Sequence, residues 1–466
     1  MNKYFWPFDS YNPTGRDEAL KIARHHAKYE HKSNESPEYC RTVNEYMLAI
    51  DRARRALVHL GATTDVQRLE KLSYRIFQDW NCRLTAVLFA GYYKRSEEDR
   101  GTADGLTRAQ AHEWARRCQQ LAKQDEPYRL VVVRKNNKAA RPSWKFGIVR
   151  YSQQLLASWI MLAQRELPGY DFYIPNGKPK FGRRGGHHKA AQQIGKALEN
   201  DYRFWAVSDL KNAYSSMGRP IVKQLFTMDK RLLRYVVCPT LRCPPCTGRS
   251  KANAIASQPQ LPQGSAHAWI ILSALIGEVL QKSILKGTPL WFIVYADNVA
   301  IGAQDILSAN GALRTFEAEL FAQPRQCGQA AGKLTLHEMM LCDGYNRREY
   351  GARTTIEGTP LHNSVDFCGY RIRRDLLDDT VHYSPSAEAW IRFWSKVTEE
   401  FTKLASDYED FDEFLSLTMR RFDKWANQFP LWARPDRARD LVQVSAVEKH
   451  DQILQRQFHQ RPKTGR

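Results

Sequence analysis

Apolar residues follow helical spacing through the first part of the chain. Between residues 66 and 87 the apolar positions are Val66, Leu69, Leu72, Ile76, Trp80, Leu84 and Val87. This spacing is typical of an amphipathic helix, and a polar, Gly-containing stretch from 96 to 105 interrupts it. The pattern therefore predicts a helical N-terminal region over residues 1–125.

The apolar pattern changes after Pro127. A continuous apolar run, 130–133, precedes a polar turn at Asn136 and Asn137, which predicts a strand and a hairpin. From about 200 to 372, short β-rich runs alternate with one apolar segment, 269–280, which is apolar almost all round and is therefore predicted to be a buried helix.

The last part of the chain returns to helical spacing. Ser384 and Pro385 have the character of an N-cap and a first-turn proline. The apolar positions that follow are Trp390, Trp394, Val397, Phe401 and Leu404. We interpret this stripe as a core face and predict helices to the end of the chain.

The amino-acid composition predicts a folded protein with a positively charged surface. Of the 466 residues 43% are hydrophobic, enough for two or three domains with sizeable cores. The 70 Lys and Arg exceed the 50 Asp and Glu by +20, which favours a polyanionic partner, although ribosomal, histone-like and membrane-surface proteins share this balance. Between Arg134 and Lys189 the only acids are Glu166 and Asp171, so positive charge is concentrated there.

Cysteine usage and apolar run lengths bear on the compartment. The nine scattered cysteines do not resemble a secreted disulfide framework, so a reducing cytoplasm is expected. The N-terminal apolar stretch is too short for a signal peptide, and no run reaches about 18 apolar residues, so we expect no membrane insertion.

Two aspartates end apolar runs. Asp209 follows the run from Phe204, and Asp297 lies between the runs 290–296 and 299–302, as the turn of a hairpin would. Alone, each is more simply a turn residue or a strand cap. If the two strands are neighbours, however, both carboxylates face one site and suit a pair of Mg²⁺ ions for in-line phosphoryl transfer.

Three segments follow one another along the chain: the apolar run that ends in Asp209, then Leu261-Pro-Gln-Gly-Ser265, then Tyr295-Ala-Asp-Asn298. Their order resembles palm motifs A, B and C of reverse transcriptases, with Tyr295-Ala-Asp-Asn298 in place of the usual Tyr-x-Asp-Asp. The resemblance implies that Asp209 and Asp297 bind two Mg²⁺ ions, with Mn²⁺ as a substitute. It also implies that Asn298 shares the catalytic site and that Gln263 and Gly264 line the incoming nucleotide.

Further matches extend the resemblance over residues 130 to 372. They make Lys135, Lys138 and Arg141 candidates for clamping the triphosphate, with a solvated basic hairpin as the alternative. Tyr214 falls where the family places a steric gate against a ribose 2′-hydroxyl, which favours DNA synthesis; an aromatic residue packed under the palm is the alternative.

Two segments resemble nucleic-acid contacts of the family. The Gly-rich stretch 181–191 would bring Arg183, Arg184, His187 and Lys189 to a nucleic-acid strand. The other segment, 367–370, resembles the primer grip, for which the candidates are Phe367, Gly369 and Tyr370. A simple β-turn is the competing interpretation of 367–370.

The chain also departs from the family. Asn298 replaces the second acid of motif C, so the site loses one negative charge and should hold cations less tightly. His267 stands near a position where proline is frequent and is interpreted as a packed residue rather than a catalyst. Lys333 is a poor match for the general-acid lysine of motif D, which cannot be placed.

Three cysteines, Cys238, Cys243 and Cys246, fall one ligand short of a zinc site. Ordinary reduced cysteines are therefore favoured, with structural Zn²⁺ as the alternative.

No RNase H, integrase, HNH or retron signature is present, so the resemblance is to stand-alone reverse transcriptases of the abortive-infection and defence-associated group. It implies a non-coding RNA partner, a DNA product made with or without a conventional template, a homo-oligomer or a second reverse transcriptase subunit, and a role in antiviral defence. Two rivals stay open: a degenerate palm that serves as an RNA-binding scaffold, and an RNA-dependent RNA polymerase.

The expected fold is an α+β right hand. We predict a helical N-terminal extension over 1–125, fingers over 126–200, a palm with an antiparallel sheet over 201–372, and a helical thumb with a basic C-terminal tail over 373–466.

Overall fold

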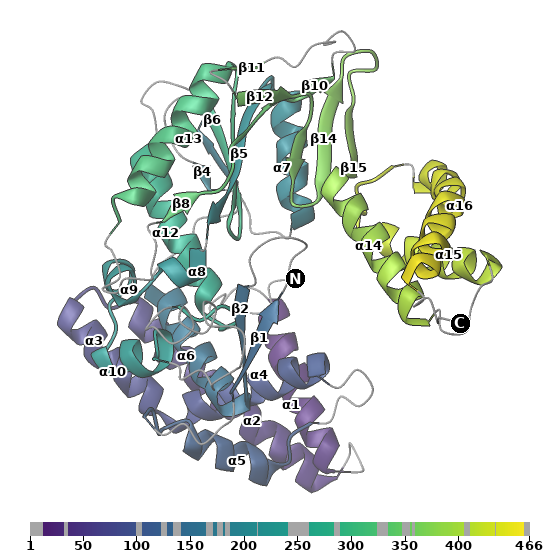
Figure 1. Cartoon of the computed structure of the whole chain (residues 1–466). Helices are drawn as coiled ribbons and strands as arrows, with labels where there is room; N and C mark the ends of the chain where they lie inside the picture. Colours follow the sequence, from purple (N-terminus) through teal and green to yellow (C-terminus); the bar gives the residue numbers. More distant parts are fainter. Residues whose placement is uncertain are drawn as a thin grey trace. The chain divides into compact units, whose positions relative to one another are not determined.

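The chain forms two compact units in the computed structural model (Figure 1). Unit 1 comprises Met1–Pro168, Leu210–Ile284 and Phe316–Thr335, and unit 2 comprises Gly169–Asp209, Leu285–Thr315 and Leu336–Arg466. The structure describes residues 13–31, 36–98, 105–122, 128–133, 141–164, 171–174, 180–181, 187–211, 213–240, 261–283, 289–323, 334–346, 355–356, 359–404, 411–433 and 435–460. Helices and strands are both present, so the α+β class is confirmed, while the predicted domain boundaries stay predictions.

Unit 1 is mainly helical. Its helices are α1 (Pro13–Glu30), α2 (Pro37–Gly61), α3 (Val66–Gln78), α4 (Trp80–Glu98), α5 (Arg108–Arg117), α6 (Ile148–Gln164), α8 (Ala213–Ser216), α9 (Arg219–Leu225), α10 (Lys230–Leu232), the π-helix η2 (Leu233–Val237) and α12 (Ala268–Ser283). None of the described helices of either unit combines the length and apolar character needed to cross a membrane.

The helical spacing over residues 66–87 belongs to two helices rather than one. The apolar spacing from 66 to 87 continues across Asp79, but Asp79 has an extended backbone that separates α3 from α4. Its carboxylate accepts a hydrogen bond from Cys82 N at 2.9 Å and so satisfies one free donor at the start of α4. Capping therefore interrupts a helix that the hydrophobic spacing alone would continue.

The predicted hairpin after Pro127 is confirmed. Strand β1 (Tyr128–Val133) pairs antiparallel with β2 (Arg141–Phe146), and the predicted turn at Asn136 and Asn137 lies outside the described residues.

Unit 2 contains a mixed sheet of nine strands among the described residues, in the order β11-β12-β9-β5-β7-β6-β3-β4, with β8 beside β5. These strands are β3 (Asp171–Ile174), β4 (Lys180–Phe181), β5 (Phe204–Lys211), β6 (Leu290–Tyr295), β7 (Asn298–Ala303), β8 (Thr335–Leu336), β9 (Met340–Asp343), β11 (Thr355–Ile356) and β12 (Thr359–His362). At the centre β5 is antiparallel to both β7 and β9, and α13 (Ile306–Phe321) follows β7. The prediction of a purely antiparallel sheet is wrong, because β12 pairs parallel with β9.

A second, smaller sheet precedes three helices in unit 2. Its strands are β10 (Tyr345–Asn346), β13 (Val365–Phe367), β14 (Tyr370–Asp375) and β15 (Val381–Pro385), and the helices are α14 (Ala387–Leu404), α15 (Phe411–Ala426) and α16 (Pro435–Gln460). The prediction that Ser384 caps the first of these helices is wrong, because Ser384 and Pro385 end β15. Ser386 is the cap, and its Oγ accepts from Ala389 N at 3.3 Å.

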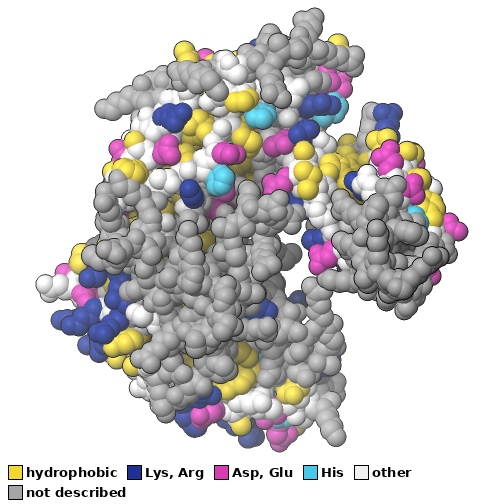
Figure 2. Space-filling view, viewed as in Figure 1, with side chains coloured by type: hydrophobic (Ala, Val, Ile, Leu, Met, Phe, Trp, Pro, Cys, Tyr) yellow, Lys and Arg dark blue, Asp and Glu magenta, His cyan; other side chains and the backbone are white. Residues whose placement is uncertain are grey.

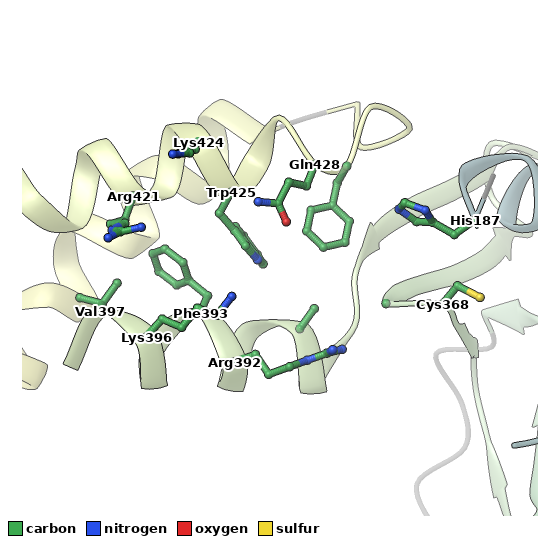
Figure 3. A pocket seen from close by; sticks show the side chains of 13 residues that line it. His187, Cys368, Arg392, Phe393, Lys396, Val397, Arg421, Lys424, Trp425 and Gln428 are labelled. Atoms are coloured by element: carbon green, nitrogen blue, oxygen red, sulfur yellow. The ribbon is translucent and has the colours of Figure 1, made fainter. Parts of the chain in front are cut away.

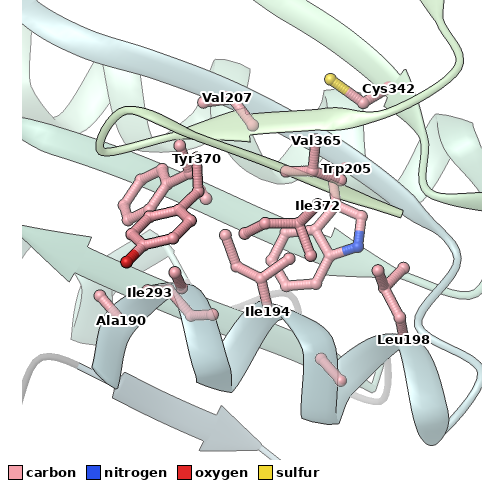
Figure 4. Close-up of a cluster of buried hydrophobic side chains, with 14 of the residues drawn as sticks. Ala190, Ile194, Leu198, Trp205, Val207, Ile293, Cys342, Val365, Tyr370 and Ile372 are labelled. Atoms are coloured by element: carbon pink, nitrogen blue, oxygen red, sulfur yellow. The ribbon is translucent and has the colours of Figure 1, made fainter. Parts of the chain in front are cut away.

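The core of unit 2 lies between the large sheet, the small sheet and α7 (His187–Glu199), as Figure 4 shows. Alternate residues of β5, Trp205 and Val207, face Ile194 of α7 and Ile372 of β14 within this cluster. Gly302 is opposite Trp205, and a Cβ there would lie 2.7 Å from the indole, so only glycine leaves room for the ring. This packing fixes the sheet face on which the candidate site lies.

Candidate active site

The first candidate carboxylate, Asp209, lies near the end of the central strand β5. The residues before it on this strand are largely buried, whereas Asp209 is half-buried. Its backbone oxygen accepts from His337 N at 2.7 Å, which anchors this end of the strand. A rigid strand thus presents the carboxylate where solvent begins.

The second carboxylate, Asp297, lies in a two-residue turn between β6 and β7. Ala296, the first turn residue, has φ +53°, a left-handed conformation that costs a non-glycine residue on the order of 1 kcal/mol. The Asn298 side-chain amide stabilises the turn by donating to Tyr295 O at 3.1 Å and to Asp297 Oδ1 at 3.3 Å. The predicted hairpin with its acid at the turn is confirmed.

Strand register brings the two motifs together. Asp209 on β5 is the Cα partner of Asn298 on β7, which in turn pairs with Tyr295 on β6. Directly opposed residues of antiparallel strands project their side chains from the same face, with Cβ atoms roughly 5 Å apart. The condition set by the sequence, that the two strands be neighbours, is therefore met.

The start of α7 and the β13–β14 turn lie beside this row. The His187 ring is 5.9 Å from the Tyr295 ring, and His188 Nδ1 is 2.6 Å from the Tyr370 hydroxyl. Burial, and then the neighbouring His188, lower the pKa of His187, which favours its neutral form near pH 7. Burial also lowers the pKa of His188, so neutral imidazoles contact the Tyr295 ring and the Tyr370 hydroxyl.

The turn between β13 and β14 consists of Cys368 and Gly369, with φ +52° and +87°. Burial, and then the charge of Asp297, raise the pKa of the Cys368 thiol, so this turn lies within electrostatic reach of Asp297. Phe367 and Tyr370 are buried in the core and support the turn, whereas Cys368 and Gly369 at its tip are half-buried. The primer-grip assignment stays a prediction.

The predicted nucleotide-binding loop lies in unit 1, against β2. Trp144 N donates to Gln263 O at 2.8 Å, and Gly264 has φ +98°. A Cβ on Gly264 would lie 2.5 Å from Trp144 O, so the close approach of the two backbones requires glycine. Tyr214, in α8, is half-buried and also belongs to unit 1.

Other predicted site residues are placed in part. Arg141 begins β2, and Lys189 is exposed on α7. Lys135, Lys138, Arg183, Arg184, Lys333, Cys243 and Cys246 lie outside the described residues. Cys238 is completely buried, and this burial raises the pKa of its thiol to about 12, which disfavours the thiolate that a metal would need.

His267, which follows the loop, is fully buried. Its Nε2 lies 2.9 Å from Val237 O, in agreement with a packed and hydrogen-bonded residue. Burial lowers its pKa to about 4. Because the unfolded chain then binds this proton more tightly, stability is lost as pH falls through the ordinary histidine range.

We therefore expect the His267 titration to remove about 2 kcal/mol of stability between pH 7 and pH 5. Urea unfolding of the parent protein and of His267→Gln at both pH values measures this term. The variant should lose about that much less stability on acidification. An equal loss in both proteins would show that His267 does not titrate in this range.

A separate cluster of possible ligands occurs at the other end of β14. Potential ligand atoms of the Asp375, Asp378 and His382 side chains lie within 4.8 Å of one another. Asp375 is half-buried, and Asp378 and His382 are exposed. Asp378 Oδ1 already accepts from Thr380 N at 3.1 Å and from its hydroxyl at 2.7 Å, so the turn itself accounts for this arrangement.

The described residues of the Asp209–Asn298 row offer a cation oxygen ligands. They are the carboxylates of Asp209 and Asp297 and the side-chain oxygen of Asn298, whose nitrogen is engaged by the hairpin. Sequence reasoning placed Tyr295 in motif C without a role of its own, and it did not single out His188 or Cys368, because only the fold brings α7 and the β13–β14 turn to this site. Comparison of the chain with protein-family models finds no match, and no curated protein matches it significantly.

Proposed function

We propose that the chain is a reverse transcriptase, an RNA-directed DNA polymerase that joins dNTPs by two-metal phosphoryl transfer. The observation that supports this most is the register of Asp209 with Asn298, which sets Asp297 one residue away at the tip of the adjacent hairpin. Two carboxylates held by paired strands form a rigid anionic site, as phosphoryl transfer requires.

Mg²⁺ fits these residues, because hard divalent cations prefer oxygen ligands and the described donor set contains two carboxylates and an amide oxygen. When bound, the ions would supply Lewis-acid stabilisation of the phosphoryl oxygens. Asp209 and Asp297 would hold them, with Mn²⁺ as a substitute. The strands restrict the movement of both side chains, so little reorganisation is needed during the reaction.

Residues of unit 1 supply the proposed substrate contacts. Gln263 and Gly264 would line the nucleotide site, and their loop is held in place by the backbone hydrogen bond to Trp144. Tyr214 would oppose a ribose 2′-hydroxyl and so select dNTPs. In the proposed right hand, β1 and β2 belong to the fingers, the sheet of unit 2 to the palm, and α14–α16 to the thumb.

Positive charge on unit 1 supports a nucleic-acid partner. Ser73 Oγ accepts from Asp229 N at 3.1 Å, and the Arg231 guanidinium lies 3.4 Å from the centroid of the Tyr74 ring, so α3 and α10 are adjacent. Figure 2 shows Lys and Arg gathered at the left, where these helices lie, and the exposed basic residues there are Arg68, Lys71, Arg75, Lys230, Arg231 and Arg234. Such a surface suits phosphate contacts.

We propose that the partner is a non-coding RNA and that the DNA product serves bacterial antiviral defence in the cytoplasm. A second reverse transcriptase subunit or a second copy of the chain would complete the assembly. One observation favours another function: Asn298 lowers the negative charge of the site, as in a degenerate palm that acts as an RNA-binding scaffold. The half-buried carboxylates, Asp209 on β5 and Asp297 in the β6–β7 turn, weigh against it, because a scaffold needs neither.

The test is synthesis of labelled DNA by purified protein with any co-purifying RNA left in place. Each dNTP is supplied singly and then all four together, in Mg²⁺ and in Mn²⁺. Product supports the polymerase, and its dNTP requirement shows whether a template is copied. Tight RNA binding without product under any condition would favour the scaffold.

A further inference from the structure

A cavity of about 280 Å³ lies within unit 2, bordered by α14, α15, the β13–β14 turn and the start of α7 (Figure 3). Its size is near the lower end of ligand pockets, which span roughly 300–1,000 Å³. It can hold one small group but not a duplex.

Four basic residues and no acid are among the described residues that line the cavity. Arg392 and Lys396, one helical turn apart on α14, and Lys424 on α15 are exposed. A fourth cation, Arg421, is already paired with Glu400, which leaves three for a ligand. Such a rim suits a phosphate group.

An aromatic wall lies behind the cations. Trp425 is half-buried, and its ring centroid is 4.9 Å from that of Phe393 and 5.0 Å from that of Phe429. Figure 3 shows Trp425 and Phe393 facing the space between α14 and α15. The two phenylalanines are buried and, together with Trp390 at a centroid distance of 4.6 Å, hold the indole in place at the cavity lining.

We propose that this cavity binds one unpaired nucleotide of a single-stranded nucleic acid, with the base against Trp425 and the phosphate on Arg392, Lys396 and Lys424. Stacking on an aromatic side chain contributes about 1–3 kcal/mol per base and needs an unpaired base, which a duplex does not offer. The binding does not depend on catalysis, so it stands apart from the proposed polymerase function.

The cavity also adjoins the carboxylate site. His187 and Cys368 are among its lining residues, and the His187 ring meets the Tyr295 ring edge to face at a centroid distance of 5.9 Å. A nucleotide held in the cavity therefore fixes a strand that passes the row of Asp209, Asn298 and Tyr295.

The test is fluorescence anisotropy with a dye-labelled single strand of about eight nucleotides, without dNTPs or divalent cation, at several salt concentrations. We expect Arg392→Gln with Lys396→Gln to weaken binding about tenfold and to lower the log–log salt slope by about 0.7 for each phosphate that is no longer neutralised. The matched control is Arg420→Gln with Arg437→Gln. Arg420 is exposed on α15 and Arg437 is exposed on α16, and neither lines the cavity. Arg420 matches Arg392 because the Nε of each donates a hydrogen bond to a backbone oxygen four residues earlier in its own helix.

A second variant separates stacking from charge and leaves the core intact. Gln428 is exposed on the cavity lining, so Gln428→Trp should fill the space and weaken binding with the salt slope unchanged. A matched duplex should bind without sensitivity to Gln428→Trp. Equal weakening in the control pair, unchanged binding by Gln428→Trp, or displacement of the strand by dAMP at comparable concentration would overturn the proposal.

Discussion

Replacing Asp209 or Asp297 by Asn is expected to lower dNTP incorporation by roughly 10³-fold. Each substitution removes one of two carboxylates. The β5–β7 register places Asp209 opposite Asn298, and Asp297 directly precedes Asn298. The loss corresponds to roughly 4 kcal/mol of transition-state stabilisation. Initial rates of labelled-dNTP incorporation measure the effect.

Asp378→Asn is the matched control, because Asp378 is an exposed acid of unit 2 in the β14–β15 turn. It should leave the rate unchanged, and all three variants should retain RNA binding and the parent circular dichroism spectrum. Full activity in Asp209→Asn or Asp297→Asn would contradict the proposed site.

Asn298→Asp is expected to make stability depend on divalent cation. The substitution removes the donor that Asn298 offers to Tyr295 O and Asp297 Oδ1, and it sets a second carboxylate beside Asp297. Without cation the protein should lose about 1–2 kcal/mol of stability, from the lost hydrogen bond and like-charge repulsion. Mg²⁺ should restore it, and half-maximal incorporation should need roughly tenfold less Mg²⁺, because one unit charge is added to a half-buried site.

Thermal unfolding in EDTA and in Mg²⁺ measures this linkage, with Asn298→Ala as the comparison. The alanine variant loses the same hydrogen bonds without gaining charge, so its unfolding temperature should fall equally in both conditions. The metal-site assignment fails if Asn298→Asp responds to Mg²⁺ no more than Asn298→Ala.

Some local features followed from short-range patterns. The hairpin that carries Asp297 could be predicted because an apolar run, a short polar turn and a second apolar run permit few other structures. The cap before α14 was misplaced by two residues, because Ser384 and Ser386 both precede the apolar stripe. Only the pairing of β15 with β14 extends the strand through Pro385 and moves the helix start.

The cavity could not be predicted from spacing. Trp390, Trp394 and Val397 were interpreted as one core stripe, and the sequence analysis assigned no role to the neighbouring basic residues Arg392 and Lys396. Their role beside Trp425 depends on how α14 packs against α15, and a periodic pattern within one helix carries no information on its partner.

The sequence by itself determined the α+β class, the strand that ends near Asp209 and the hairpin turn at Asp297, since these depend on the alternation of apolar and polar residues over a few positions. Only the tertiary structure decided that β5 lies beside β7, that His187 and Cys368 border the carboxylates, and that α14 and α15 enclose a basic, aromatic cavity. These relations join residues far apart along the chain, and their geometry is set by the packing of whole elements in the core.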